Sequence, residues 1–444
     1  MEFLFIAPFR TDFNLNSLEA ICHREAIVDV LLLAVQAENE IDSGFRWLVP
    51  WNKEEKGELH YSELNEDQVP DSATPLLKLH LQPKYVKQKL DEILAESEFK
   101  EYEINKCDVL YFDNTVGILT ITLSFSDRYK HEDVFPVVDK WSTQLCSSIV
   151  KIIVPHEVSI LKNIQSLSKE RERNLFLSPR DFIVFFDRFE NSMANTDKEN
   201  ERMLWVNRTY IGHVDNGLSP VLERWTQSRE LRESALLLDE SAISTCVGNS
   251  VVYGKLSEEN KYAVETALQI STYFYVLYDV FNKILKLLYL EMSSSKKAKE
   301  STISRVNRIR AHIEFIENEF GDVLMGLQGK RSAIASRFME TWSYSELVDA
   351  VQKKKNSASR FAESILSERQ NKYGRVVEAF LAAIGGVSLL DFILSLFAFS
   401  NDKNLNTDTV VGIVDGAKRL PVDGVLYAAI ALLVFVLILV LRKR

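Results

Sequence analysis

Residues 376–399 read VVEAFLAAIGGVSLLDFILSLFAF, and residues 425–441 read VLYAAIALLVFVLILVL. The first stretch holds 24 residues with two carboxylates, and the second holds 17 residues without a charge. A helix rises about 1.5 Å per residue, so about 20 apolar residues cross a hydrocarbon core of roughly 30 Å. We predict two transmembrane helices, with a pair of buried core helices as the alternative.

Basic residues flank this pair of apolar stretches. They gather before the first stretch and after the second, at Arg360, Arg369, Lys372, Arg375, Arg442, Lys443 and Arg444. Lys and Arg are enriched on the cytoplasmic side of membrane segments. We therefore predict a multi-pass protein of the cell inner membrane with cytoplasmic N- and C-termini, an external loop at 400–424 and a cytosolic basic tail at 442–444.

Three polar residues interrupt the first apolar stretch at helical spacing. Ser388, Asp391 and Ser395 are three and four residues apart, so they share one helical face, and Asp402 continues that face beyond the stretch. A carboxylate inside a bilayer costs a few kcal/mol and normally faces a bundle interior or a water-filled path. This pattern predicts pore-lining residues, with a structural hydrogen bond or a protonated, functionless carboxyl as alternatives. Because two spans cannot enclose a channel, a pore implies a homo-oligomer.

The part before the membrane stretches is acidic. Residues from Tyr373 onward hold seven Lys and Arg and six Asp and Glu, which leaves a net charge of −11 on the preceding residues. Nonspecific nucleic-acid binding needs a basic surface, so this composition argues against it. The four cysteines are far apart and lie in apolar runs, and we expect reduced core thiols in a cytosolic body.

Residues 221–420 contain no proline, which permits long helices. Apolar residues recur at helical spacing in 262–292 and 304–327, with a polar turn at 293–301 between them. We predict a helical hairpin and stalk over 256–375, with a helix from Val348 to Lys372 that runs directly into the membrane. Within it we expect Lys353, Lys354 and Lys355 to face lipid or solvent.

The N-terminal part alternates β-rich and helical runs. Helical spacing occurs at 18–38 and 134–153. The alternation of such stretches with β-rich runs predicts an α/β or α+β cytosolic sensor domain over 1–255. The β-rich runs are 3–8, 107–112, 116–125, 203–213 and 235–254.

Signatures of several common chemistries are absent from the sequence. Gly326 to Ser332 has the wrong glycine spacing for a phosphate-binding loop and reads as a helix interruption. The chain has no HExxH pair, no zinc spacing of cysteines and no GxSxG elbow, so we expect neither an enzyme nor a tightly bound cofactor. A cluster of basic residues predicts either contacts to an anionic ligand or a solvated face. It consists of Arg305, Arg308 and His312, together with Lys296, Lys297 and Lys299.

The layout resembles the CorA-like two-transmembrane metal transporters over nearly the whole chain. It combines a β-rich N-terminal body, a helical hairpin, a long helix leading into a first span, an external loop and a short second span with a basic tail. That family ends its first span with Gly-Met-Asn, whereas this chain reads Phe397-Ala-Phe-Ser400-Asn401-Asp402, in which Asn401 is a candidate remnant at the pore mouth. The resemblance implies a pentamer.

Divergent CorA-like proteins without this motif are similar to the membrane effectors of type III CRISPR systems. The resemblance implies an effector in antiviral defence whose cytosolic domain senses a nucleotide second messenger, adenylated S-adenosylmethionine, and gates ion passage or disturbs the membrane. The alternative is a divalent-cation transporter for Mg²⁺ or Co²⁺, in which Mg²⁺ is the regulatory ligand. A third hypothesis is a non-conducting membrane scaffold.

Overall fold

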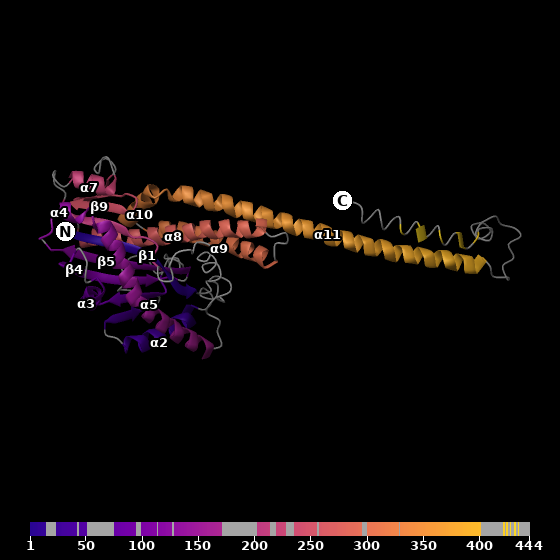
Figure 1. Cartoon of the computed structure of the whole chain (residues 1–444), viewed down its shortest axis with the longest axis horizontal. Coiled ribbons are helices and arrows are strands. Elements are labelled where there is room, and N and C mark those ends of the chain that lie inside the picture. The colour runs from indigo at the N-terminus through magenta and orange to yellow at the C-terminus, as the bar shows by residue number, and fades with distance from the viewer. Residues whose placement is uncertain are drawn as a thin grey trace. The chain divides into compact units, whose positions relative to one another are not determined.

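The computed structural model describes most of the chain, with gaps (Figure 1). It describes residues 1–14, 24–41, 44–50, 75–94, 99–112, 114–126, 128–170, 202–213, 219–227, 235–254, 257–294, 300–327, 329–400, 421, 423, 424, 427, 430, 431 and 434. The chain divides into two compact units, Met1–Ala358 and Ser359–Arg444. We call the first the N-terminal unit.

The N-terminal unit mixes strands and helices. In chain order its elements are β1 (Glu2–Asn14), α2 (Arg24–Asn39), β2 (Phe45–Leu48), β3 (Leu77–Leu81), α3 (Pro83–Ile93), β4 (Tyr102–Tyr111), β5 (Asn114–Phe125), α4 (His131–Val134), α5 (Val138–Glu170), β6 (Asn207–Gly212), α7 (Ser219–Thr226), β7 (Leu236–Leu238), β8 (Ser241–Ser244), β9 (Asn249–Gly254), α8 (Glu258–Ser294), α9 (Glu300–Gly326) and α10 (Gly329–Thr341). The final helix, α11 (Tyr344–Ser400), begins in this unit and continues into the second.

One sheet of nine strands organises the described part of the N-terminal unit. Its order is β2-β3-β4-β5-β1-β6-β9-β8-β7. Neighbouring strands pair antiparallel, except β6 and β9, which are parallel. The strand β1 lies near the middle, between β5 and β6, and its residues Phe3 to Ala7 are all buried. A strand buried on both sides must have both faces of the sheet covered.

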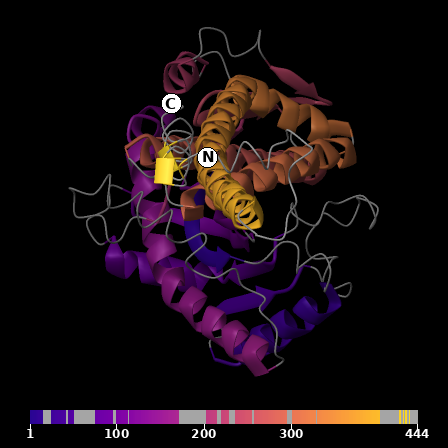
Figure 2. The same ribbon diagram turned by 90° about the vertical axis from the view of Figure 1, so that its right-hand side faces the viewer.

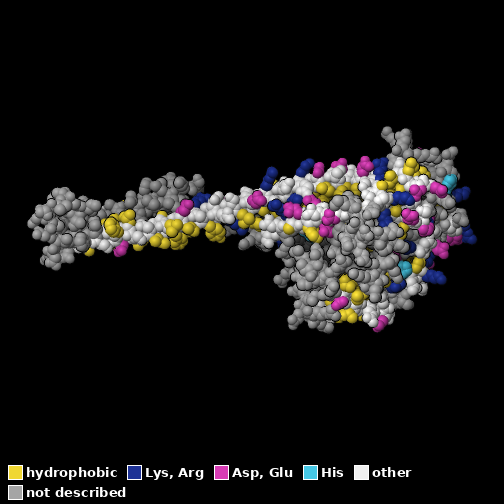
Figure 3. All heavy atoms as spheres, turned by 180° about the vertical axis from the view of Figure 1, so that it is seen from behind, with side chains coloured by type: hydrophobic (Ala, Val, Ile, Leu, Met, Phe, Trp, Pro, Cys, Tyr) yellow, Lys and Arg dark blue, Asp and Glu magenta, His cyan; other side chains and the backbone are white. Residues whose placement is uncertain are grey.

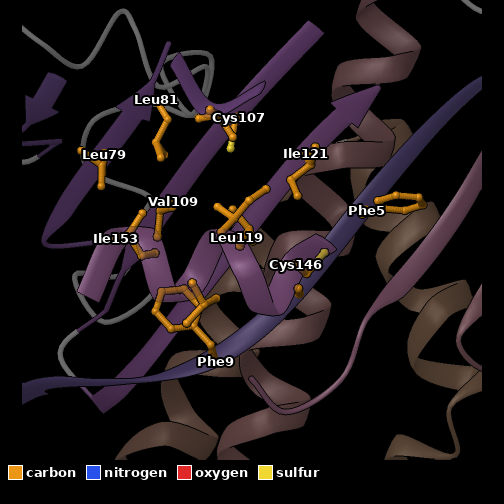
Figure 4. Close-up of a cluster of buried hydrophobic side chains, with 14 of the residues drawn as sticks. Phe5, Phe9, Leu79, Leu81, Cys107, Val109, Leu119, Ile121, Cys146 and Ile153 are labelled. Atoms are coloured by element: carbon orange, nitrogen blue, oxygen red, sulfur yellow. The ribbon is translucent and has the colours of Figure 1, made fainter. Parts of the chain in front are cut away.

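Helix α5 covers the first face of the sheet, together with α2 and α3. Phe5 and Phe9 of β1 point into the same apolar cluster as Cys146 and Ile153 of α5 (Figure 4). The ring of Trp141 lies within 6.4 Å of the ring of Phe5 at a steep angle, an arrangement that aromatic pairs favour. This face is therefore the main hydrophobic core.

Helix α8 lies on the second face and contacts β1 and β5, on the opposite side of the sheet from α5 (Figure 2). Polar side chains take part in this contact. The Gln269 Nε2 atom donates a hydrogen bond to Thr120 Oγ1 at 2.9 Å, and Asn207 Nδ2 donates to Thr272 Oγ1 at 3.1 Å. All four of these residues are buried, so each polar atom depends on its partner.

The remaining helices of the unit follow α8. Helix α9 packs against α8 as the predicted hairpin, and α10 contacts α8 extensively. The helix interruption predicted at 326–332 is confirmed, since α9 ends at Gly326 and α10 begins at Gly329, whose φ is +60°. Such a positive φ is easily adopted by glycine.

The mixed α/β class predicted from the sequence is confirmed, and so is a long apolar helix near the C-terminus. The β-rich run 235–254 forms three short strands, β7 to β9, and the helix expected at 134–153 begins at Val138 and runs to Glu170 in α5. Cys107 and Cys146 are buried free thiols as expected, whereas Cys246 is half-buried and Cys22 lies outside the described residues.

We predict that Phe5→Ala lowers the free energy of unfolding of the N-terminal unit by about 3–5 kcal/mol, because a fully buried ring leaves a cavity. Urea unfolding followed by tryptophan fluorescence measures this, since all six tryptophans precede residue 343. Leu237→Ala, at a side chain that is 79% exposed, is the control and should change the value by less than about 0.5 kcal/mol. Equal effects of the two substitutions would contradict the assignment of the core.

Candidate functional site

The C-terminal part of α11 is apolar and exposed. Two described helices are long and apolar enough to cross a membrane, α5 and α11. Half of the apolar window of α5 is buried inside its own unit, whereas none of the window of α11 is buried. Large hydrophobic side chains emerge along it (Figure 3), at Val376, Val377, Phe380, Leu381, Ile384, Val387, Leu389, Phe392 and Leu394. An apolar surface of this extent marks a membrane or protein contact.

The three predicted pore-lining residues lie on this part of α11. Ser388, Asp391 and Ser395 are all helical and exposed, and their spacing places them on one face of the helix. Asn401 and Asp402, the predicted pore mouth, lie outside the described residues, as does most of the predicted second span. Its described hydrophobic positions Tyr427, Ile430 and Val434 are exposed.

Helix α11 starts inside the N-terminal unit. Ser343, with a φ of +51°, precedes it, and the ring of the buried Tyr344 lies 5.2 Å from Tyr278 of α8 and 4.9 Å from Phe320 of α9. Val351, two turns further on, is fully buried. The first turns of α11 are therefore packed against the helical hairpin.

The lysines near this start correct one expectation. Lys355 does not face lipid or solvent: it is 7% exposed, and its Nζ lies 3.7 Å from Glu314 and 3.6 Å from Glu317 of α9. Lys354 donates a hydrogen bond to Asn282 of α8. A buried ammonium needs partners of opposite charge, and α9 supplies them.

The predicted anion contacts lie on α9. Arg305 is half-buried, and the side chain of Arg308 lies outside the described residues, as do Lys296, Lys297 and Lys299. His312 packs edge-on against Phe281 of α8, with 5.6 Å between ring centroids, and burial lowers its pKa to about 4. A histidine with this pKa is neutral at pH 7, so any positive charge here comes from the arginines.

A cavity of about 610 Å³ lies between the second face of the sheet and the first turns of α8. Its charged lining is mixed, with four carboxylates and three cationic side chains. The strands contribute Glu2, Leu4, Asn105, Lys106, Thr122 and Ile211, and the helices contribute Glu258, Glu259, Lys261, Tyr262, Glu265 and Arg331.

Two ion pairs cross this cavity from the sheet to α8. Lys106 Nζ lies 2.6 Å from Glu265 Oε1, and Lys261 Nζ lies 3.1 Å from Glu2 Oε2. Burial alone would lower the pKa of Lys106, but the carboxylates of Glu265 and Asp108 outweigh it and raise the pKa above the usual value. Lys106 is therefore firmly charged.

Asp108 extends this network toward the neighbouring strand β3. Its carboxylate accepts a hydrogen bond from His80 Nδ1 at 2.7 Å and lies 3.1 Å from Lys78 Nζ. Burial alone would raise the pKa of Asp108, but the bond from His80 and the charges of Lys78 and Lys106 lower it to about 2. Polar and charged groups thus run from β3 through β4 to α8.

A β-bulge in β4 places Lys106 in the cavity. The register with β5 shifts between Ile104 and Lys106, so Asn105 and Lys106 together oppose Thr122. Buried core residues therefore occupy even positions up to Ile104 and odd positions from Cys107 onward. In a regularly alternating strand without a bulge, Lys106 would lie on the same face as the buried Ile104.

The sequence did not identify the residues of this cavity. Lys106 and Glu265 are 159 positions apart, and no spacing rule connects them. One signal was available in the sequence: the alternation of apolar residues in this strand runs through even positions up to Ile104 and through odd positions from Cys107. Such a change in alternation predicts a bulge. Among the described residues, no group of three His, Cys, Asp or Glu is arranged to hold a metal ion.

Comparison of the chain with models of known protein families, with curated proteins and with solved structures finds no match. The class is therefore defined by the fold alone. It is a mixed α/β unit, followed by a helix that is long and apolar enough to cross a membrane.

We predict that His312 contributes a loss of stability as the pH falls from about 6.5 to 4. Unfolded His312 takes up a proton in this window, whereas the folded form with a pKa of about 4 does not. In the wild type, this group should change the free energy of unfolding by on the order of 2–3 kcal/mol between pH 6.5 and pH 4. In His312→Gln this pH-dependent change should be absent. An unchanged slope in the variant would contradict a neutral imidazole packed against Phe281.

Glu157 of α5 should act in the opposite direction. Its carboxylate is buried and accepts hydrogen bonds from Arg202 at 2.9 Å and from the Asp12 amide at 2.8 Å. Burial nevertheless raises its pKa to about 7. The stability that this group contributes is present below about pH 4.5 and is lost as the pH rises toward 7. Glu157→Gln removes this loss, so the free energy of unfolding of the variant should rise more steeply between pH 4.5 and 7 than that of the wild type. A shallower rise in the variant would refute this assignment.

Proposed function

We propose that the protein is a membrane-anchored sensor that assembles as a homo-oligomer and conducts ions along Ser388, Asp391 and Ser395 when its N-terminal unit binds a ligand. One observation carries the proposal: α11 is a single helix from Tyr344 to Ser400, which is packed in the N-terminal unit at its start and is apolar at its end apart from this polar face and Glu378. The same helix thus belongs to the sensing part and to the membrane part.

The polar face supports assembly. A carboxylate on a lipid-exposed surface is unfavourable by a few kcal/mol, so Asp391 is stable only when it faces other helices or water. Several copies arranged around an axis provide both, and they turn the face toward a common path. A ring of carboxylates in such a path attracts cations.

Helix α8 offers a route from ligand to membrane helix. It lines the cavity at Glu265 and contacts the first turns of α11 at Asn282, about 25 Å further along at 1.5 Å per residue. A ligand shifts the closed-to-open equilibrium only by as much as it prefers one form. A hundredfold shift needs about 3 kcal/mol of that preference.

The setting of this proposal is the cell inner membrane, with both termini in the cytoplasm. The ligand is a nucleotide second messenger, adenylated S-adenosylmethionine, in type III CRISPR antiviral defence. The layout of the chain and the basic residues that flank its apolar stretches support this reading. Mg²⁺ transport and a non-conducting scaffold are the outcomes that would replace it.

Ion flux through the purified protein in liposomes tests the proposal. We predict cation flux that appears only when adenylated S-adenosylmethionine is present, and that falls severalfold in Asp391→Asn because one charge per subunit is lost. Asp349→Asn is the matched control, since it removes an exposed carboxylate from the same helix outside the apolar stretch. It should conduct as the wild type does.

Three other results would refute the proposal. Mg²⁺ uptake without any nucleotide would identify a transporter. No flux under any condition would leave the scaffold. Ligand-dependent flux that is identical in Asp391→Asn and the wild type would remove Asp391 from the conducting path.

A further inference from the structure

The cavity between the sheet and α8 holds most of its charged side chains in ion pairs with one another. Lys106 is paired with Glu265, and Lys261 with Glu2 and, at 3.2 Å, with Glu258. The side chains of Lys106, Glu265, Lys261 and Glu2 are between 14% and 32% exposed, so each is partly withdrawn from water and depends on its partner. A ligand that enters the cavity therefore contacts both positively and negatively charged side chains.

We propose that this cavity binds a small molecule that carries a cationic group and an anionic group. The cationic group pairs with Glu265 and the anionic group with Lys106, in place of the ion pair that these two residues form with each other. The assignment deepens the proposed function by locating its ligand. The control of α11 by this ligand rests on the proposed function, whereas the binding itself does not.

The pairing excludes ligands with one sign of charge. An anion that binds Lys106 displaces Glu265 and leaves that carboxylate unpaired beside another negative charge. A cation that binds Glu265 leaves Lys106 facing Asp108 alone, at 3.6 Å. Breaking a pair and leaving one partner partly buried is unfavourable, whereas a ligand with both signs leaves neither partner alone.

The construction of β4 supports a binding role. The bulge at Asn105 brings two consecutive side chains into the cavity lining, which a regular strand cannot do. Bulges commonly re-aim a side chain next to a functional site. Here the bulge supplies the lysine, Lys106, that pairs with Glu265 of α8.

The size and the remaining lining indicate the kind of molecule. A volume of about 610 Å³ lies within the range of small-molecule sites, roughly 300–1,000 Å³. Arg331 of α10 lies 5.7 Å from the centre of the Tyr262 ring, and the pair offers a flat surface for a planar group. A planar ring joined to groups of both charges fits these features.

A second cavity of about 980 Å³ fits this class of ligand less well. It lies between α3 and the start of β4 and is lined by Lys84, Lys87, Asp91 and Tyr102, among others. The ammonium of Lys87 lies 3.4 Å from the centre of the Tyr102 ring and covers that face more closely than Arg331, at 5.7 Å, covers Tyr262.

Titration calorimetry of the full-length protein in detergent tests the assignment with three probes. Adenylated S-adenosylmethionine carries both signs, AMP is anionic and spermidine is cationic. We expect the first probe to bind at least tenfold more tightly than the other two. Lys106→Met and Glu265→Gln should each weaken its binding at least tenfold.

Lys89→Met is the matched control, since Lys89 forms an exposed ion pair with Glu92 on α3, away from this cavity. It should bind as the wild type does. If Lys106→Met does not fold, as judged by tryptophan fluorescence, Lys261→Met tests the same cavity at its other ion pair between the sheet and α8.

Equal binding of AMP and the doubly charged probe would overturn the requirement for both signs. Undiminished binding in a folded Lys106→Met or Lys261→Met variant would overturn the site, and so would the absence of binding by all three probes. Binding in the cavity without any change in liposome flux would uphold this assignment and refute the proposed gating, so the two can fail separately.

Discussion

The packing of α8 on the sheet is the constraint on which the rest of the structure depends. Its contacts include two buried amide and hydroxyl pairs, Gln269 with Thr120 and Asn207 with Thr272, and the partly exposed ion pair of Lys106 with Glu265. Such pairs add only about 1 kcal/mol each, but a buried polar atom left without its partner costs more. They therefore specify how α8 lies on the sheet, and α9, α10 and the start of α11 then pack against α8 or its hairpin partner.

The two faces of the sheet consequently play different parts. The face toward α5 is apolar and aromatic, and it supplies the stability of the N-terminal unit. The face toward α8 is polar in part, since Thr120 and Asn207 on it form hydrogen bonds with α8. Polar contacts fix the orientation of α8 on the sheet but add little stability. A ligand that competes for the charged side chains can therefore change how α8 packs.

The sequence predicted the elements that depend on local patterns, but not the site that depends on distant contacts. The apolar run of β1, the proline-free helices and the break at Gly326 follow from periodicity and backbone preference. Lys355 was misjudged because a lysine in a basic run reads as solvated, and only the placement of α9 brings Glu314 and Glu317 to it. The cavity escaped prediction because β1, β4 and α8 meet only in the folded chain.

The central claim is that one helix leads from the N-terminal unit into a bilayer, and cysteine accessibility along α11 tests it most directly. In a chain without reactive native thiols, reconstituted into liposomes, a cysteine at Ser367 should react readily with a charged maleimide, because this exposed position precedes the apolar stretch. A cysteine at Val387 should be protected by lipid. Rapid labelling at both positions would contradict the account.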